Sequence, residues 1–308
     1  MRLRNLRPIY IPFAAAVLGL CLPAQAAKAK TAKQPKPREL WVAFTSNVLG
    51  RIYFCGTCPH AFGAMAHKGA MFARWRKELG GPLLVLDAGN CLNFGGGAKA
   101  APFMLRAMDL CKYAAANVGD NEAAFGPHVV RSAAKGANVK WLSCNVRLAS
   151  GSALFPASTV VNAGGLRVAV IGVLDREALR DGFAPSKDLR VENGLECVKQ
   201  EAKRLGGKYD VLIILAHAPA ERLIEYARAV PQASLIAGGS TVRPAPEPQI
   251  VGSTLVFQPV VYGVARVRLV PKGGRYIAAE RKRVPVYSNA PTDPDVMRIV
   301  EDFQRHGG

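Results

Sequence analysis

Beyond its first residues, the chain of 308 residues lacks any long apolar run, and this excludes a membrane-spanning segment from the rest of the sequence. The one run present, at residues 9–22, is shorter than the roughly 20 residues that a stable membrane anchor needs. It follows three arginines and precedes Ala24-Gln25-Ala26, which places small residues at the positions that signal peptidase reads. Residues 1–26 therefore resemble a secretory signal with cleavage near Ala26, and we expect a periplasmic or secreted protein.

Acidic residues are scarce: 22 Asp and Glu stand against 41 Lys and Arg, for a net charge of +19. Residues 1–38 carry eight of the basic residues and no acid, so that the remaining chain has a charge of +11. Residues 27–38 cannot bury apolar surface and are predicted to be a flexible basic leader before a single domain at 39–308. A basic surface could attract a small anionic ligand. Aromatic residues, only 7% of the chain, are not interleaved with basic ones, which argues against a nucleic-acid partner.

Cysteine is also sparse for a chain of this length. Of the seven cysteines, six remain after the predicted signal is removed, too few for a scaffold that depends on disulfides. Cys111 and Cys197 lie in stretches with helical spacing and are expected to pack as small apolar residues.

Strand-like and helix-like segments alternate along the chain. Strands are predicted at residues 40–45, 83–86, 113–118, 139–143, 158–162, 167–173, 211–215, 235–237, 249–251, 254–258, 265–269 and 276–284. Helices are predicted at residues 62–79, 102–110, 127–135, 192–205, 221–229 and 293–304. The alternation predicts an α/β fold with parallel strands, and the hairpins in the middle and at the end predict two packed sheets. In such folds, functional residues collect at the carboxyl ends of the strands.

Seven short motifs stand at those strand ends. They are TSNVLGR at 45–51, VLDAGN at 85–90, GDNEAAFG at 119–126, SCNV at 143–146, VIGV at 170–173, LAH at 215–217 and IAGGSTV at 236–242. In their order and spacing they resemble the motifs of the calcineurin-like metallophosphoesterase superfamily, in its 5′-nucleotidase and UDP-sugar hydrolase branch. The resemblance covers roughly residues 40–269 and corresponds to the N-terminal domain of that branch. It implies a four-layer α-β-β-α sandwich.

Members of this superfamily hold two divalent metals that grip phosphate and activate water. At the positions where they carry ligands, this sequence has Asn47, Leu49, Asn90, Asp120, Asn121, Ser240 and Val242. His217 alone keeps the residue that the superfamily has at a ligand position. Glu122 directly follows Asp120 and Asn121, which stand where the superfamily has an Asn-His pair. Asparagine and serine bind divalent cations weakly, while leucine and valine cannot bind them. The resemblance therefore implies a protein with a degenerate dimetal site that is not a standard phosphatase. We expect the site to hold no metal or a single divalent ion such as zinc. Such a one-metal site would use Asp120, His217 and a cysteine.

A Cys-x-x-Cys motif follows the first strand, in the order Cys55-Gly56-Thr57-Cys58-Pro59-His60. Because residue 59 is proline, the motif does not match a haem-attachment sequence. Three interpretations stay open: a structural disulfide, a redox-active or sulfur-handling pair with a thiol-redox partner, and a metal site. Candidate ligands for that metal site are Cys55, Cys58, His60, Cys91 and His217.

The leading hypothesis is an exported metallophosphoesterase-fold protein in which a cysteine pair works in the ancestral cleft. The candidate catalytic residues are Cys55, Cys58, Asp120 and His217. The candidate cleft residues at or beside the ancestral metal positions are Asn47, Asn90, Cys91, Asn121, Glu122 and Ser240. One alternative is a periplasmic phosphoesterase or nucleotidase with an unusual metal site, and another is a non-catalytic binding protein. The sequence leaves open whether the protein is an enzyme.

Overall fold

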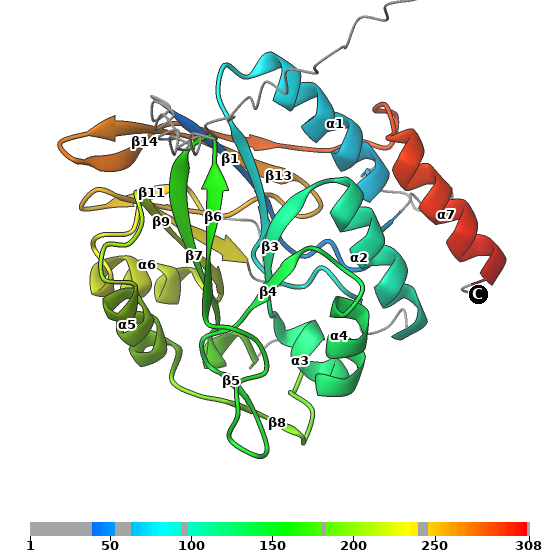
Figure 1. Ribbon diagram of the computed structural model, residues 1–308, viewed down its shortest axis with the longest axis horizontal. Coiled ribbons are helices and arrows are strands. Elements are labelled where there is room, and N and C mark those ends of the chain that lie inside the picture. The colour runs from blue at the N-terminus through cyan, green and yellow to red at the C-terminus, as the bar shows by residue number, and fades with distance from the viewer. Residues whose placement is uncertain (1–38, 53–62, 94–97, 180–182, 240–245, 307–308) are drawn as a thin grey trace, which may run out of the picture. The chain divides into compact units, whose positions relative to one another are not determined.

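The computed structural model describes residues 39–52, 63–93, 98–179, 183–239 and 246–306. Within these ranges, two six-stranded sheets pack together (Figure 1). The first sheet has the spatial order β14 (Arg275–Val284), β13 (Val264–Lys272), β1 (Leu40–Thr45), β2 (Leu83–Asp87), β3 (Tyr113–Asn117), β4 (Lys140–Leu142). The second has the order β11 (Gln249–Val251), β12 (Thr254–Phe257), β10 (Leu235–Gly239), β9 (Val211–His217), β7 (Leu166–Leu174), β6 (Ser158–Ala163). A separate two-stranded ribbon joins β5 (Val146–Leu148) to β8 (Leu189–Val191).

Both sheets combine a block of parallel strands with antiparallel strands at one or both edges. In the first sheet β1 to β4 are parallel to one another, and β13 and β14 extend the β1 side in antiparallel fashion. In the second sheet β7, β9, β10 and β12 are parallel, and antiparallel β6 and β11 form the two edges. Parallel strands need crossover connections, and helices supply most of them here.

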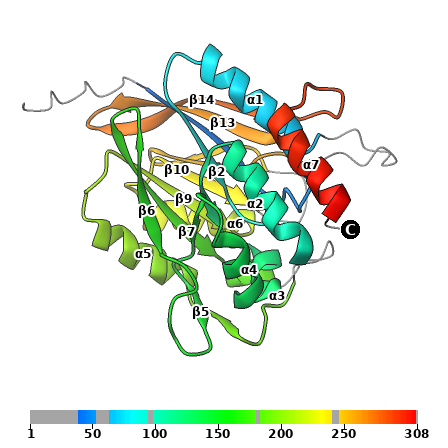
Figure 2. The same ribbon diagram turned by 45° about the vertical axis from the view of Figure 1, so that its right-hand side comes forward.

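Helices cover the outer side of each sheet. The helices on the side of the first sheet are α1 (Met65–Glu78), α2 (Ala101–Leu110), α3 (Asp120–Phe125), α4 (Pro127–Ala134) and α7 (Pro294–His306). Those on the side of the second sheet are α5 (Gly194–Leu205) and α6 (Ala220–Ala229). Helices α1, α2 and α7 pack side by side (Figure 2).

The period-two alternation of the buried strands explains the layers. In β1, the side chains of Leu40, Val42 and Phe44 point into the apolar layer between the two sheets. Ala43, between them in sequence, points to the opposite face and packs under the helices of the first sheet. A third apolar cluster fills the space between the second sheet and helices α5 and α6. Because β1 is buried on both faces, its sequence reads as a continuous apolar run.

The predicted fold class is confirmed: the structure has two mixed sheets flanked by helices, in the four-layer order. Three short elements escaped the sequence prediction, namely α3, β5 and β8. Helix α3 has six residues and the two ribbon strands have three each, so none is long enough to show a periodic apolar pattern.

The predicted signal and leader, residues 1–38, lie outside the described residues. None of the helices within the described ranges is long and apolar enough to cross a membrane.

Candidate functional site

The carboxyl ends of the central strands of the two sheets meet at one edge. His217 ends β9 and pairs in register with Gly239, which ends β10. A Cβ atom on Gly239 would lie 2.9 Å from Cβ of Ser46 and 3.0 Å from the carbonyl oxygen of Ala88, both of which follow strands of the first sheet. Only glycine permits this close approach, so residues from both sheets contribute to the site.

Two loops at this edge contain left-handed residues. Asn47 has φ 51° and Asn90 has φ 61°, the region that asparagine tolerates better than most residues. The backbone N–H of Asn47 donates to the carbonyl oxygen of Gly89 at 3.0 Å, which joins the loop after β1 to the loop after β2. The asparagines at these ancestral metal positions therefore suit the backbone of the two loops.

Asp120 is the centre of the site. It is fully buried, and Nε2 of His217 lies 2.7 Å from its Oδ1 atom. Nδ2 of Asn90 donates to the same oxygen at 2.8 Å, and the backbone N–H of Phe183 donates to Oδ2 at 3.0 Å. Burial alone would raise the pKa of Asp120, but the contacts with His217, Phe183 and Asn90 outweigh it, so that the pKa lies below its ordinary value. Asp120 is therefore an ionised carboxylate whose two oxygens already have protein partners.

Glu122 is fully buried and accepts three backbone hydrogen bonds. The N–H groups of Asn90 and Gly119 each donate to Oε2 at 2.9 Å, and the N–H of Leu92 donates to Oε1 at 2.8 Å. Burial raises the pKa of Glu122 in spite of these donors. This carboxyl group fixes the loop after β2 against the start of α3, so its role in the structure is to position Asn90.

Asn121 is held between its neighbours in the same loop. Its backbone N–H donates to Oδ1 of Asn90 at 3.1 Å, and its Nδ2 donates to the carbonyl oxygen of Leu92 at 2.9 Å. The amide of Asn90 thus bridges Asp120 on one side and Asn121 on the other. A neutral amide performs this bridge because it donates and accepts at once, which a carboxylate at position 90 could not do.

A second polar cluster lies beneath this edge and was not predicted from the sequence. Oγ1 of Thr45 donates to Oδ2 of Asp87 at 2.6 Å and lies 2.9 Å from Oη of Tyr113. Since the single hydroxyl proton of Thr45 goes to Asp87, the Tyr113 hydroxyl is the donor in the second bond. Burial raises the pKa of Asp87 to about 8 and lowers the pKa of the fully buried Lys68 on α1 to about 8. The only sequence signal for this cluster was the presence of polar residues within apolar segments.

Asn117, the last residue of β3, is another site residue that the sequence prediction missed. Its Nδ2 atom donates to the carbonyl oxygens of Val173 at 2.8 Å and of Ala88 at 3.3 Å. Val173 belongs to the second sheet and Ala88 follows β2 of the first. This one amide therefore joins the two sheets at the edge where the site lies.

The described residues of the site do not fit a dimetal centre. Both oxygens of Asp120 and both oxygens of Glu122 accept hydrogen bonds from the protein. Among the described site residues, Nδ1 of His217 and the Oδ1 atoms of Asn117 and Asn121 have no hydrogen-bond partner. One imidazole nitrogen and two amide oxygens are too few to hold two divalent cations. Within the described ranges, no group of three or more His, Cys, Asp or Glu side chains is arranged to hold a metal ion.

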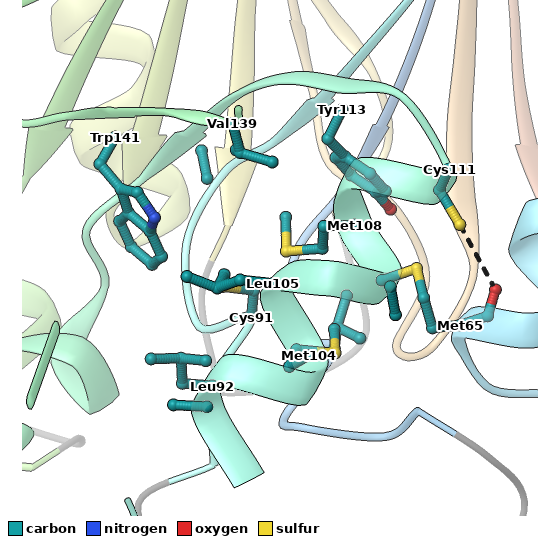
Figure 3. Close-up of a cluster of buried hydrophobic side chains, with 14 of the residues drawn as sticks. Met65, Cys91, Leu92, Met104, Leu105, Met108, Cys111, Tyr113, Val139 and Trp141 are labelled. Carbon is teal, nitrogen blue, oxygen red and sulfur yellow. Dashed lines mark hydrogen bonds between the residues drawn. The ribbon is translucent and has the colours of Figure 1, made fainter. Parts of the chain in front are cut away.

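Cys91 was a candidate cleft residue and metal ligand beside Asn90. In the structure it is fully buried and packs in the apolar cluster under α2, with Leu92, Met104 and Leu105 (Figure 3). The left-handed backbone at Asn90 turns the chain, so that the adjacent side chains of residues 90 and 91 have different surroundings. Burial, followed by the nearby carboxyl groups of Glu122 and Asp87, raises the pKa of the Cys91 thiol well above its ordinary value.

The remaining candidates fall outside the described residues. Cys55, Cys58 and His60 lie in segment 53–62, and Ser240 lies in segment 240–245. The described residues on either side of the first segment are Ile52 and Gly63, and both lie at the N-terminus of α1. There the N–H of Ala66 donates to the carbonyl oxygen of Ile52 at 3.2 Å.

Comparison with known proteins places this fold. No family model matches the chain, and no curated protein sequence matches it. Solved structures do match. A 5′-nucleotidase precursor from Thermus thermophilus is similar over 87% of this chain and 58% of its own, with 22% identity and a TM-score of 0.73. The calcineurin-like phosphoesterase YfkN from Bacillus subtilis is similar over 87% of this chain and 97% of its own, with 15% identity and a TM-score of 0.68. The chain has the metallophosphoesterase fold.

This fold is the one that the sequence motifs predicted, in the form found in 5′-nucleotidases. The sulfate thiohydrolase SoxB from Thermus thermophilus has it too, with 17% identity and a TM-score of 0.69 over 88% of this chain and 61% of its own. The chain spans about three fifths of the length of the 5′-nucleotidase precursor and of SoxB.

Proposed function

We propose that this protein is an exported member of the metallophosphoesterase fold that no longer performs dimetal hydrolysis. Its metal centre is replaced by a closed hydrogen-bond network of Asn90, Asp120, Asn121, Glu122 and His217. The observation that carries the proposal is that Asp120 and Glu122 each accept three hydrogen bonds from protein donors. Because a carboxylate has about four lone-pair positions, three internal hydrogen bonds leave each of these groups little capacity for a bridging role between two cations.

The second part of the proposal concerns the cysteine pair. Cys55 and Cys58 belong to a segment whose described neighbours, Ile52 and Gly63, lie at the N-terminus of α1. Gly50, close to the start of that segment, donates its N–H to the carbonyl oxygen of Cys91 at 2.8 Å, directly after Asn90. The described chain therefore passes beside the ancestral metal positions at Gly50. We assign the working chemistry of the cleft to this thiol pair, in redox or sulfur handling with a small anionic ligand or a thiol-redox partner.

Hydrolysis assays test the first part. Purified full-length protein is incubated with a generic phosphodiester and with nucleotides, with manganese or zinc added. The expected result is no turnover above that of a matched His217→Ala variant. His128→Ala serves as the control, because His128 is exposed on α4 and remote from the network. Turnover that His217→Ala abolishes and His128→Ala preserves would establish a hydrolase with an unusual metal site.

Thiol titration tests the second part. The number of reactive thiols is measured in native protein before and after mild reduction, and again in a Cys55→Ser/Cys58→Ser variant. We expect mild reductant to release two thiols that are missing in the double variant. If Cys55 and Cys58 remain oxidised under mild reductant, the pair is a structural disulfide and the redox assignment is wrong.

A further inference from the structure

Cys144 and Cys197 form a second cysteine pair, away from the Cys-x-x-Cys motif. Cys144 follows β4 and is 3% exposed, while Cys197 is half-buried in the first turns of α5. Although the two residues are 53 positions apart, both lie beside Glu192: Sγ of Cys197 is 3.9 Å from its Oε2 atom, and Nδ2 of Asn145, next to Cys144, donates to its carbonyl oxygen at 3.0 Å. Both pack against the apolar cluster between the second sheet and helices α5 and α6.

The surrounding backbone keeps the two cysteines together. The N–H of Glu192 donates to the carbonyl oxygen of Asn145 at 2.8 Å, and Nδ2 of Asn145 donates back to the carbonyl oxygen of Glu192 at 3.0 Å. The ribbon of β5 and β8 continues this connection, with Val146 opposite Val191. Asn193 caps α5 through its side chain and fixes the direction in which the helix starts. The segments that carry the two cysteines are thus hydrogen-bonded to each other at Asn145, next to Cys144, and at Glu192, in the turn before Cys197.

Charged groups beside the pair distinguish its two members. The guanidinium of Arg147 donates to the carbonyl oxygen of Cys144 at 3.3 Å, and its Nε lies 2.9 Å from Oε2 of Glu192. The hydrogen bond from Cys144, followed by the charge of Arg147, lowers the pKa of Cys197. The same hydrogen bond together with burial raises the pKa of Cys144. Cys197 is accordingly both the more accessible thiol and the one more readily deprotonated.

We propose that Cys144 and Cys197 are a disulfide-forming site, which an extracytoplasmic disulfide of low molecular weight oxidises. The Cys197 thiolate attacks one sulfur of that disulfide, which forms a mixed disulfide and releases one small thiol. Cys144 then loses its proton and attacks Sγ of Cys197, which forms the Cys144–Cys197 bond and releases the second small thiol. Two protein thiols are oxidised, and one external disulfide is reduced to two thiols. The product joins the segment after β4 to α5.

The other cysteines in the described ranges lack such a partner thiol. Cys91 and Cys111 are fully buried or nearly so, and Sγ of Cys111 lies 3.9 Å from the carbonyl oxygen of Met65 (Figure 3). Helical spacing predicts that Cys197 packs as a small apolar residue, and this describes only part of its surroundings, since its Sγ atom also lies 3.9 Å from Oε2 of Glu192.

Peptide mapping tests the proposal. Reduced full-length protein is incubated with oxidised glutathione, the remaining thiols are alkylated, and the protein is digested with trypsin without reduction. Trypsin separates the two cysteines into peptides 141–147 and 191–199. We expect these peptides to be joined, with a mass two hydrogens below their sum, and to stay joined in a Cys55→Ser/Cys58→Ser variant. In Cys144→Ser the expected product is a glutathione adduct on Cys197.

Thermal unfolding gives an independent measurement in the Cys55→Ser/Cys58→Ser background. Oxidation is expected to raise Tm by roughly 5–10 °C, because the disulfide restricts a loop of about 50 residues in the unfolded chain. Adding Cys144→Ser is expected to remove this shift. If peptides 141–147 and 191–199 are recovered separately alkylated, or if glutathione remains on Cys197 in the presence of Cys144, the proposal is wrong. These outcomes do not depend on the metal site, so they are separate from a failure of the proposed function.

Discussion

Replacing Asn90 by aspartate is the sharpest perturbation of the network, because it changes one amide into a carboxylate at nearly constant shape. Asn90→Asp restores the residue that the metallophosphoesterase resemblance expects at the bridging position. In this structure, the change removes the Nδ2 donor that lies 2.8 Å from Oδ1 of Asp120 and sets two buried carboxylates against each other. The variant is expected to be markedly less stable at neutral pH.

The size of the effect can be worked out for two cases: both carboxyl groups stay ionised and repel each other, or one of them takes up a proton. Two unit charges about 4 Å apart repel by about 4 kcal/mol at an effective dielectric constant of 20. Protonating one carboxyl instead costs about 4 kcal/mol at pH 7, because its unperturbed pKa lies roughly three units lower. Whichever route the protein takes, we expect Asn90→Asp to lower the free energy of unfolding by about 4 kcal/mol at pH 7. Near pH 5 the proton costs less, so the loss should fall to about 2 kcal/mol.

Urea denaturation followed by tryptophan fluorescence measures this loss, since Trp41, Trp75 and Trp141 are all buried. Asn162→Asp is the matched control, because Asn162 is exposed and uses only its Oδ1, as the acceptor for the N–H of Gly165. The control should lie within about 0.5 kcal/mol of the wild type. An Asn90→Asp protein as stable as the wild type at pH 7, without added metal, would refute the hydrogen-bond network as described.

Three further predictions concern the polar groups that support the site. Because burial raises the folded-state pKa of Asp87 from 3.8 to about 8, its contribution to stability is complete below about pH 4 and is lost as the pH rises to about 8. The folded-state pKa of Lys68 is lowered from 10.5 to about 8, so stability returns between pH 8 and 10.5. The free energy of unfolding, measured from pH 5 to 10, should therefore have a minimum near pH 8. Below that pH it should fall with a limiting slope of ~1.4 kcal/mol per pH unit, and Asp87→Asn should remove this fall. An unchanged slope in the variant would contradict the assignment. Asn117→Ala should destabilise the protein by about 2–4 kcal/mol in urea, because two carbonyl groups lose their donor, whereas a loss below 1 kcal/mol would show that this link between the sheets is unimportant. Gly239→Ala should cost about 1–3 kcal/mol, because its Cβ would meet Ser46; a variant with unchanged Tm would show that the two strand ends can move apart.

The fold was predictable because it depends on long, repeated signals. The runs predicted as strands at residues 40–45 and 211–215 are almost wholly apolar, and each lies in a strand that is fully buried. The motifs that follow such strands then indicated the fold, because their order and spacing resemble those of the metallophosphoesterases. Short elements such as α3 gave no comparable pattern, although it carries Asp120 and Glu122 at the centre of the site.

The sequence could predict which residues of the site lie near one another, but not which hydrogen bonds they make. The sequence identified residues 90, 120, 122 and 217 as neighbours, because strand ends converge at one edge. It could not show that Asn90 donates to Asp120 and accepts from Asn121, since those contacts depend on the left-handed turn at residue 90. The same turn explains why Cys91 packs in the core instead of the cleft.

The proximity of Cys144 and Cys197 could not be predicted from the sequence for another reason. Helical spacing placed Cys197 in a helix, and the structure confirms that it lies in α5. Its partner lies in a different segment, and the ribbon of β5 and β8 that aligns them consists of two three-residue strands. A pairing that depends on such short elements leaves no periodic trace in the sequence.

Calorimetric titration with manganese and with zinc tests the central claim most directly. The titrated protein is the full-length Cys55→Ser/Cys58→Ser variant, in which the thiols of the Cys-x-x-Cys motif cannot act as ligands. With Asp120 and Glu122 occupied by internal donors, the account predicts no saturable binding in the micromolar range. Binding of two ions per chain that Asp120→Asn or His217→Ala abolishes would contradict it.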